Sequence, residues 1–204
     1  MFGHDRLDHS EPARLKKLRV TQMAVGFEEV ALKRAEWAQL KRKERKAILA
    51  RQLFPSVLGP QGEHYIVDHH HLGLALIEEG VDEVAVVQLD DLSWLDPATF
   101  WRTLEFRSWA HPYDARGRRC AWEAMPRRLD GLADDPHRSL AGLVRRAGGY
   151  AKSEVPFAEF QWAEHFRPRI PAARIRRALR ASVTEAVRMA HLAEARYLPG
   201  WTHA

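Results

Sequence analysis

The sequence predicts an α+β protein, in which a small mixed sheet with packed helices is followed by a helical C-terminal region. Short runs of β-branched residues, which are typical of strands, occur only in the first half of the chain. From Glu123 onward, apolar residues recur at helical spacing and no convincing strand follows. We therefore expect a flexible N-terminus at residues 1–14, an α+β domain at 15–120 and a helical domain at 121–204.

The first half is expected to alternate between short strands and helices. Gly59-Pro60-Gln61-Gly62 is dense in turn residues, so the runs on either side predict a β-hairpin. Gly80 follows a helical run and is a natural helix C-cap. In chain order, the expected elements are a strand at 18–23, a helix at 28–53 with a potential break in its charged middle, hairpin strands at 56–58 and 64–67, a helix ending near residue 79, and a strand at 83–89.

The second half is expected to consist of helices. Asp96 is a candidate N-cap, with Pro97 at the first helical position. Asp135-Pro136 begins another helix, which ends before Gly148-Gly149. The remaining expectations are a loop-rich border near 108–124, a helix at 157–166, and a last helix that starts at Pro171 and keeps helical spacing to about residue 193.

The composition is that of a soluble globular chain with a basic balance. Hydrophobic residues make up 46% and charged residues 29%, the net charge is +5, and the pI is about 9.6. No apolar run approaches the roughly 18 residues that a membrane span needs. The N-terminus lacks the apolar core of a signal peptide, so we expect a cytoplasmic protein. The single cysteine, Cys120, excludes an internal disulfide and zinc sites of the Cys-x-x-Cys kind.

Basic residues concentrate in two clusters, Lys41–Lys46 and Arg167–Arg180. Such positive charge permits an anionic partner, for example nucleic acid. Either cluster could contact the phosphate backbone of DNA, or it could be the solvated face of a helix. DNA binding through these basic helices is therefore one candidate function.

The segment Tyr65–Leu76 (YIVDHHHLGLAL) carries the most chemistry. A strand leads directly into a helix there, so Asp68 and the three following histidines lie at a helix N-terminus, which favours an anion such as phosphate. Asp68 could instead cap the helix by accepting from the N–H of His70 or His71. His69 and His71 are two residues apart and cannot both face one site. Adjacent histidines rarely reach one metal ion together, which disfavours a zinc site.

These residues resemble the D-G-H-H-R box of the ParB/sulfiredoxin superfamily, and the chain looks closest to the branch of ParB-like nucleases. The resemblance covers roughly residues 15–170 and implies a ParB/sulfiredoxin-like fold with a phosphate-binding pocket. Four further segments agree with that branch in the same order: VTQMAVGFEEV, VLGPQGEHYIVDHHH, EVAVVQLDDLS, and DDPHRSLAGLVRRAGGYAKSEVPFAEFQWAEHFR.

The chain also departs from the superfamily's box. His69 stands where glycine is usual, and Leu72 stands where arginine is usual. His70 occupies the position of the sulfiredoxin cysteine, so the resemblance does not extend to reduction of cysteine sulfinate. The chain lacks the Glu-Arg-Arg of the chromosome-partitioning members, which bind CTP. Relatives with a His-His box include phosphotransferases that act on free serine.

The resemblance implies roles for several residues. An acidic residue of the first helix faces the box in the superfamily, and Glu28 and Glu29 match it. With a nucleotide and Mg²⁺ or Mn²⁺, either glutamate would act as metal ligand or base, together with Asp68. His70 or His71 would bind phosphate or act as an acid in phosphoryl transfer or phosphodiester hydrolysis. Alternatively, both glutamates complement the dipole of their own helix.

Further candidates for phosphate contact are His69 in the box, and Arg138 and Lys152 in the second half. Arg138 lies at a predicted helix start and could reach phosphate, and Lys152 could cover it. A surface-paired helix terminus is the alternative for both. Gln22 is a weaker candidate for a polar pocket wall, and Phe160 at helical spacing is more typical of a core than of a nucleobase platform.

Three functions remain open from the sequence. The first is an enzyme, a nuclease or nucleotide-dependent phosphotransferase, whose partner is a nucleotide or a phosphorylated small molecule. The second is a non-catalytic DNA-binding or scaffold protein. The third is a pocket that holds an anion without catalysis. A homo-oligomer is compatible with all three, and no membrane partner is expected.

Overall fold

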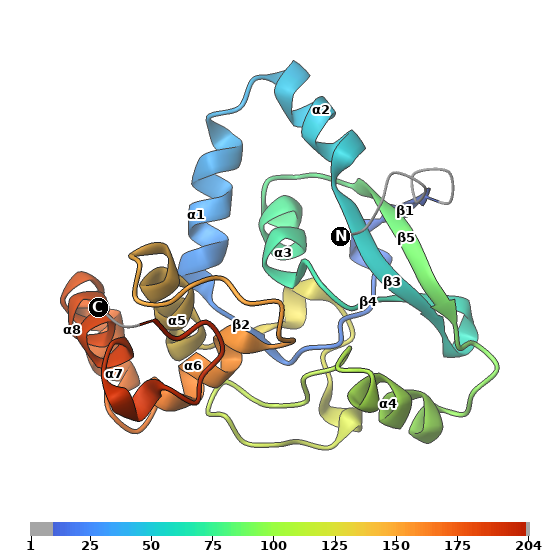
Figure 1. The fold of residues 1–204 in the computed structure, drawn as a ribbon. Helices are drawn as coiled ribbons and strands as arrows, with labels where there is room; N and C mark the ends of the chain where they lie inside the picture. Colours follow the sequence, from blue (N-terminus) through green and yellow to red (C-terminus); the bar gives the residue numbers. More distant parts are fainter. Residues whose placement is uncertain (1–9, 203–204) are drawn as a thin grey trace.

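The structure, a computed structural model that describes residues 10–202, confirms the mixed α/β fold class (Figure 1). Four strands form a curled sheet in the order β1-β5-β3-β4. Strand β3 runs parallel to β5, whereas β1 and β4 pair antiparallel with their neighbours. The strands are β1 (Ser10–Arg14), β3 (Leu53–Gly59), β4 (Glu63–Ile66) and β5 (Glu83–Asp91), and a separate parallel pair joins β2 (Ala24–Val25) to β6 (Ala133–Asp134).

The helices fall into two groups. Helices α1 and α3 lie beside the sheet, whereas α5 to α8 gather on the other side of α1 (Figure 1). Within residues 10–202, no helix is long and apolar enough to cross a membrane. The helices are α1 (Phe27–Ala38), α2 (Arg42–Arg51), α3 (His70–Glu78), α4 (Pro97–Phe106), α5 (Pro136–Arg146), α6 (Ala158–Phe166), α7 (Ala172–Arg177) and α8 (Leu179–Ala190), with short 3₁₀ turns η2 (Leu15–Lys17), η3 (Pro60–Gly62), η4 (Trp122–Ala124), η5 (Leu129–Gly131) and η6 (Ala193–Ala195).

Two predictions for the start of the chain are corrected. Residues 10–14 were expected in the flexible N-terminus, but they form β1, which is paired with β5 along its whole length; residues 1–9 lie outside the described part. The expected strand at 18–23 makes only isolated bridges, because Leu18 and Val20 are buried in the core instead of extending a sheet.

The helix predictions are correct in their positions but not in every length. The helix expected at 28–53 does break in its charged middle, between α1 and α2. The last helix, expected from Pro171 to about residue 193, is two helices, because Ala178 leaves helical geometry with φ −141° and ψ 54°. Asp96 caps α4 as expected by accepting from the N–H groups of Ala98 and Thr99.

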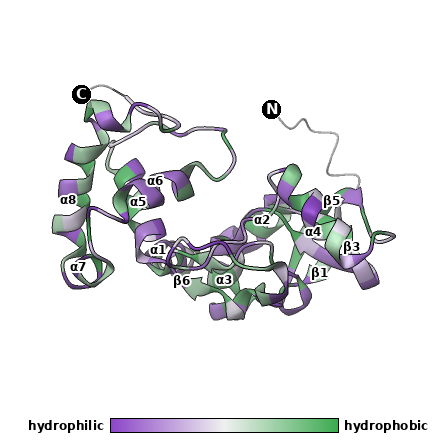
Figure 2. Cartoon of the chain, turned by 90° about the horizontal axis from the view of Figure 1, so that it is seen from below, coloured by the Kyte–Doolittle hydropathy of each residue, from purple (hydrophilic) through white to green (hydrophobic). Residues whose placement is uncertain are grey.

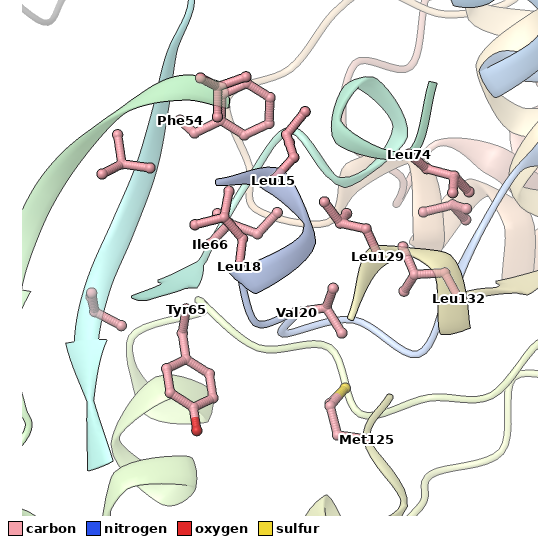
Figure 3. Close-up of a cluster of buried hydrophobic side chains, with 14 of the residues drawn as sticks. Leu15, Leu18, Val20, Phe54, Tyr65, Ile66, Leu74, Met125, Leu129 and Leu132 are labelled. Atoms are coloured by element: carbon pink, nitrogen blue, oxygen red, sulfur yellow. The ribbon is translucent and has the colours of Figure 1, made fainter. Parts of the chain in front are cut away.

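A first cluster of buried apolar side chains lies between the sheet, α3 and the turns η2 and η5. Leu15 and Leu18 enter it from η2, and they meet Phe54 and Ile66 of the sheet and Leu129 of η5 (Figure 3). All five are at most 1% exposed. Burial of this kind stabilises a fold by about 1.5–3 kcal/mol per large side chain. The short η2 turn is therefore fixed at both ends by the core.

A second cluster holds the helical group together. Trp162 and Phe166 of α6 pack with Leu140 of α5, Ile175 of α7 and Ala186 of α8. Figure 2 shows this group on one side of the molecule and the sheet on the other, with α1 and β6 between them. The first cluster reaches Leu132 and the second begins at Leu140, so the border between the cores falls later than residue 120.

Two glycines allow α1 and α5 to approach each other where the two cores meet. A Cβ atom on Gly26, the residue before α1, would lie 2.6 Å from the backbone nitrogen of Ser139. A Cβ atom on Gly142 would lie 1.5 Å from Oε1 of Glu29. Real Cβ atoms do not come that close to other atoms. At Gly26 the obstacle is backbone, so only glycine permits this packing, whereas a Cβ on Gly142 would displace the carboxylate of Glu29. The start of α1 is thereby held against α5, beside the start of α3.

Candidate functional site

The turn into α3 explains why glycine is usual at one position of the box. His69 is the N-cap of α3 and has a left-handed backbone, with φ 67° and ψ 20°. A non-glycine residue there costs about 1–2 kcal/mol. The His69 ring turns away toward β3, where Nε2 lies 2.8 Å from Nε2 of Gln52 and the ring meets Phe54 edge-on. The histidine therefore strains the turn, and its ring contacts Gln52 and Phe54.

Asp68 does not cap α3, and that interpretation is wrong. Its Oδ1 accepts a hydrogen bond from the N–H of His69 at 2.6 Å, and its side chain is 72% exposed. The reason is that the left-handed residue His69 takes the N-cap position itself. The backbone N–H groups of the first turn of α3 are left for another acceptor.

His70 is held as a neutral imidazole inside the protein. It is 1% exposed, and its Nε2 accepts a hydrogen bond from the backbone N–H of Thr21 at 3.1 Å. Burial lowers the pKa of His70 to about 3. Since Nε2 accepts, Nδ1 carries the proton. This Nδ1 atom is buried and has no hydrogen-bond partner within residues 10–202.

His71 repeats this arrangement one residue later. Its Nε2 accepts from the backbone N–H of Gly26 at 2.9 Å, so Nδ1 again carries the proton. Burial and the positive charge of Arg138 lower the pKa of His71 well below its ordinary value. Its Nε2 lies 3.8 Å from Oε2 of Glu29. Two backbone donors thus fix both imidazoles as donors through Nδ1.

An ion pair between Glu29 of α1 and Arg138 of α5 lies beside His71. Nη1 of Arg138 donates to Oε1 of Glu29 at 2.8 Å, and the two side chains are only 10–11% exposed. The guanidinium also lies over the ring of Phe160, 5.2 Å from its centre, while its Nε has no partner in the described part of the chain. We call Thr21, Gly26, Glu29, His70, His71 and Arg138 the histidine junction.

Aromatic rings lead from the histidine junction toward the surface. The rings of His111 and Phe160 have centres 3.9 Å apart and are tilted by 32°, and those of Tyr113 and His111 are 4.7 Å apart and tilted by 31°. Burial and the charge of Arg138 lower the pKa of His111 to about 4, so this ring is neutral at neutral pH. The backbone of Gln22 forms an isolated parallel β-bridge with His111. The buried side-chain Oε1 of Gln22 has no partner among residues 10–202. Neither His111 nor Thr21 was predicted, because both reach the site only through the tertiary fold.

The start of α5, which carries Arg138, is fixed by a second polar cluster. Asp135 caps α5 by accepting from the N–H of His137 at 2.9 Å, and it accepts from Nη2 of Arg167 at 2.7 Å. Burial would raise the pKa of Asp135, but the hydrogen bonds from His137 and Arg167 hold it below its ordinary value. Asp135 therefore stays charged and anchors the helix start.

The structure brings some predicted residues together and leaves others apart. Glu29, His70, His71 and Arg138 meet in the histidine junction. Glu28 is exposed, and only its backbone N–H contacts α5, by donating to Oγ of Ser139. The other candidates that stand outside the histidine junction are Asp68, whose side chain is exposed, His69, whose ring turns toward β3, and Lys152, which is exposed on the loop between α5 and α6.

The donor set for a divalent ion is small. Within residues 10–202, no three His, Cys, Asp or Glu side chains are grouped to hold a metal. Glu29 is the carboxylate beside His71, and its Oε1 is already bound to Arg138. Mg²⁺ is usually bound through one or two carboxylates plus substrate phosphates. The histidine junction thus offers one carboxylate, Glu29, toward such an ion.

Two open cavities lie away from the histidine junction, and the larger has a volume of about 630 Å³. Cavity size alone would point there, but the buried, unpartnered polar atoms of the histidine junction are stronger evidence for a chemical site. His71 and Glu29 keep 12% and 11% of their side-chain surface in solvent, so the histidine junction is not completely closed to solvent.

A strand that leads into a His-His box at a helix start, faced by a glutamate of the first helix, defines a ParB-like α/β protein. The family described as Putative ParB-like nuclease matches residues 12–168. The crystal structure of protein Atu1540 from Agrobacterium tumefaciens is similar, with 40% identity, coverage of 96% of this chain and 98% of that chain, and a TM-score of 0.88. No curated protein matches the sequence. The chain belongs to the ParB-like nuclease family, as its sequence predicted.

Proposed function

We propose that the histidine junction binds the phosphate of a nucleotide or another phosphate ester and supports phosphodiester hydrolysis or phosphoryl transfer. The observation that carries this proposal is the pair of buried imidazoles, His70 and His71, in which a backbone donor occupies each Nε2 and leaves Nδ1–H as the donor. Neutral N–H donors, a guanidinium and free helix N–H groups together suit a phosphate. The match to the ParB-like family spans residues 12–168 and so includes these residues, which supports the proposal.

Each side chain of the histidine junction would have the role that its chemistry allows. Arg138 can share its guanidinium between Glu29 and a phosphate, because its Nε is not bound within residues 10–202. The Nδ1–H groups of His70 and His71 would donate to phosphate oxygens. Glu29 would accept the proton of an attacking water or hydroxyl group as its oxygen bonds to phosphorus. The leaving oxygen would take its proton from solvent.

The test uses a matched pair of glutamates. Hydrolysis of bis(p-nitrophenyl) phosphate and of a labelled oligonucleotide is measured with EDTA, Mg²⁺ or Mn²⁺ in turn. We expect Glu29→Gln to lower the rate by at least a hundredfold, the size usual for a catalytic base. Glu28→Gln, one residue away with an exposed side chain, should stay within twofold of the wild type. Equal rates in the two variants would contradict the role of Glu29.

A ligand can bind even where catalysis has been lost, so binding is measured separately. Calorimetry with AMP should show binding that His71→Ala abolishes and His69→Gly preserves, since the His69 ring faces away from the junction. Unchanged affinity in His71→Ala would contradict the binding site. Binding without turnover in the wild type would leave an anion-holding pocket as the function.

A second candidate is non-catalytic DNA binding through α2. No side chain of this helix is buried, and Arg42, Lys43 and Lys46 are exposed and form no ion pair within residues 10–202. Cations presented in this way could contact the phosphates of a duplex, with steep salt dependence. Retardation of duplex DNA that Lys43→Ala/Lys46→Ala removes would support it.

The proposal also includes a cytoplasmic location and self-association of the chain. Light scattering, which measures the molar mass in solution, tests self-association.

A further inference from the structure

A groove on the sheet side of the molecule combines cations with aromatic walls. Its larger part has a volume of about 630 Å³ and is lined by β1, η2, the β3–β4 turn and Arg128. A neighbouring smaller part, about 280 Å³, shares the lining residues Arg19 and Glu63 with the larger part. The sheet is curled so that its two edge strands come close, and His64 of β4 lies 3.1 Å from Glu11 of β1. We call these two cavities together the basic groove.

The cations of the basic groove outnumber its acids. Five lining residues are Lys or Arg and two are Glu in the larger part. Arg19 pairs with Glu63 at 3.0 Å, and Arg128 pairs with Asp130 at 3.3 Å. The other three cations, Arg14, Lys16 and Lys17, are exposed and have no ion-pair partner within residues 10–202. The groove therefore carries uncompensated positive charge toward an anion.

The backbone that carries these lysines is fixed. Lys16 and Lys17 stand between Leu15 and Leu18, which are 0% and 1% exposed and point into the core (Figure 3). The N–H of Leu15 donates to the carbonyl of Asp82, and the N–H of Arg19 donates to that of His64. The lysines are thus presented on a rigid turn, which lowers the entropy lost when they bind a ligand.

The smaller part of the groove has flat walls. Tyr65, Trp101 and Trp122 line it, and the two indole rings are nearly parallel, with 16° between their planes. Trp122 is partly exposed, and the guanidinium of Arg19 lies over the ring of Tyr65, 5.9 Å from its centre. A charged channel that continues into aromatic walls is the pattern that binds single strands, because cations contact the phosphates and rings stack on unpaired bases.

We propose that the basic groove binds single-stranded nucleic acid, with Lys16 and Lys17 on the phosphates and Trp122 against a base. Charge complementarity and aromatic walls both favour this ligand, and both lie apart from the histidine junction. A duplex hides its base faces and would lose the aromatic contact. An acidic polypeptide would gain the charges but not the stacking.

The test is the fluorescence anisotropy of fluorescein-labelled dT12 with the full chain in 50 and 200 mM NaCl. We expect Lys16→Ala/Lys17→Ala to weaken binding at least tenfold at the lower salt, and to lower the slope of log affinity against log salt by about 1.4, since each contact in a single strand contributes about 0.7. Arg188→Ala/Arg196→Ala, which removes two exposed cations from the helical group, should stay within twofold. Calorimetry of His71→Ala with AMP reports on the histidine junction.

A second variant tests the aromatic wall. Trp122→Leu keeps an apolar side chain and should weaken dT12 binding about tenfold while leaving the salt slope unchanged. Absence of dT12 binding at 50 mM NaCl would overturn the proposal, and so would an equal loss of dT12 affinity in Arg188→Ala/Arg196→Ala or in Lys43→Ala/Lys46→Ala. Duplex binding as tight as dT12 binding would also overturn it. The same holds if polyglutamate competes as well as unlabelled dT12 and Trp122→Leu has no effect. Since His71→Ala reports separately, failure here is distinguishable from failure of the proposed phosphate site.

Discussion

The histidine junction and the basic groove both present nitrogen donors to an anion, but in opposite surroundings. His70 and Arg138 are 1% and 8% exposed, whereas Lys16 and Lys17 stand in solvent. In the junction, burial removes the charge of the imidazoles and backbone donors fix their orientation. In the groove, the charges remain and are screened by salt. Changes in the junction should therefore alter the free energy of unfolding and its dependence on pH. Changes in the groove should alter ligand affinity and its dependence on ionic strength.

The largest expected effect comes from breaking the buried ion pair of the junction. Arg138→Ala leaves the carboxylate of Glu29 buried and uncompensated, so we expect a loss of about 3–5 kcal/mol in the free energy of unfolding. The matched control is Arg146→Ala on the same helix, whose pair with Glu36 is exposed, and it should cost less than about 1 kcal/mol. Urea unfolding measures both. Similar losses in the two variants would show that the Glu29 pair is not a buried one.

The next effect tests the close approach of α1 and α5. Gly26→Ala would place a Cβ atom 2.6 Å from the backbone nitrogen of Ser139, which cannot move alone. We expect a loss of about 1–3 kcal/mol, as for other overpacked sites. Gly131→Ala is the control, because its Cβ would meet only a side-chain carbon of Pro126 at 3.3 Å. Gly26→Ala at wild-type stability would mean that the helices can separate freely.

The neutral imidazoles predict a dependence on pH. The pKa of His70 is about 3 in the folded chain and about 6.5 in the unfolded chain, so between these values the unfolded state binds more protons. Its contribution to stability is complete above about pH 6.5 and is lost as the pH falls, by roughly tenfold per pH unit in the unfolding equilibrium constant. Urea midpoints from pH 7.5 to 5 measure this, and His70→Gln should reduce the slope by one proton. A flat profile in the wild type would contradict the buried neutral state.

The smallest expected effect lies in the groove. Lys16→Ala/Lys17→Ala removes exposed side chains, so the free energy of unfolding should change by less than about 0.5 kcal/mol. The same variant is expected to lose dT12 affinity, which separates binding from folding. Thermal and urea unfolding check it. A loss above about 1 kcal/mol would show that these lysines support the fold and would remove the contrast between the two regions.

Most elements were predictable from local patterns, whereas those that depend on distant partners were not. Turn residues, capping residues and helical periodicity were enough to predict the hairpin, the helix starts and the break after α1. The segment SEPAR, with Pro12 and charged residues, has no strand pattern of its own, and it becomes β1 because β5 offers partners 69 to 77 residues away. Conversely, Leu18–Met23 has the composition of a strand but serves to anchor the core.

The candidate site divides in the same way. The box at Asp68–His71 and the glutamate facing it could be predicted from the sequence, but the choice of Glu29 over Glu28 could not, since it depends on which side of α1 meets α5. Arg138 lies 109 residues from Glu29 and was only a weak candidate. His111 lies in a loop with no helical or strand pattern, and the structure alone brings it onto Phe160.

The most direct test of the account is the state of the two buried histidines. In ¹⁵N-histidine NMR spectra at pH 7, His70 and His71 should both be neutral, with a protonated Nδ1 and an unprotonated Nε2. Adding AMP should shift their Nδ1 resonances while His191, at the end of α8, stays unchanged. Assignment uses His70→Gln and His71→Ala. A phosphate site at the start of α3 would be contradicted by protonated Nε2 atoms or by charged rings. It would also be contradicted if millimolar AMP did not shift the Nδ1 resonances.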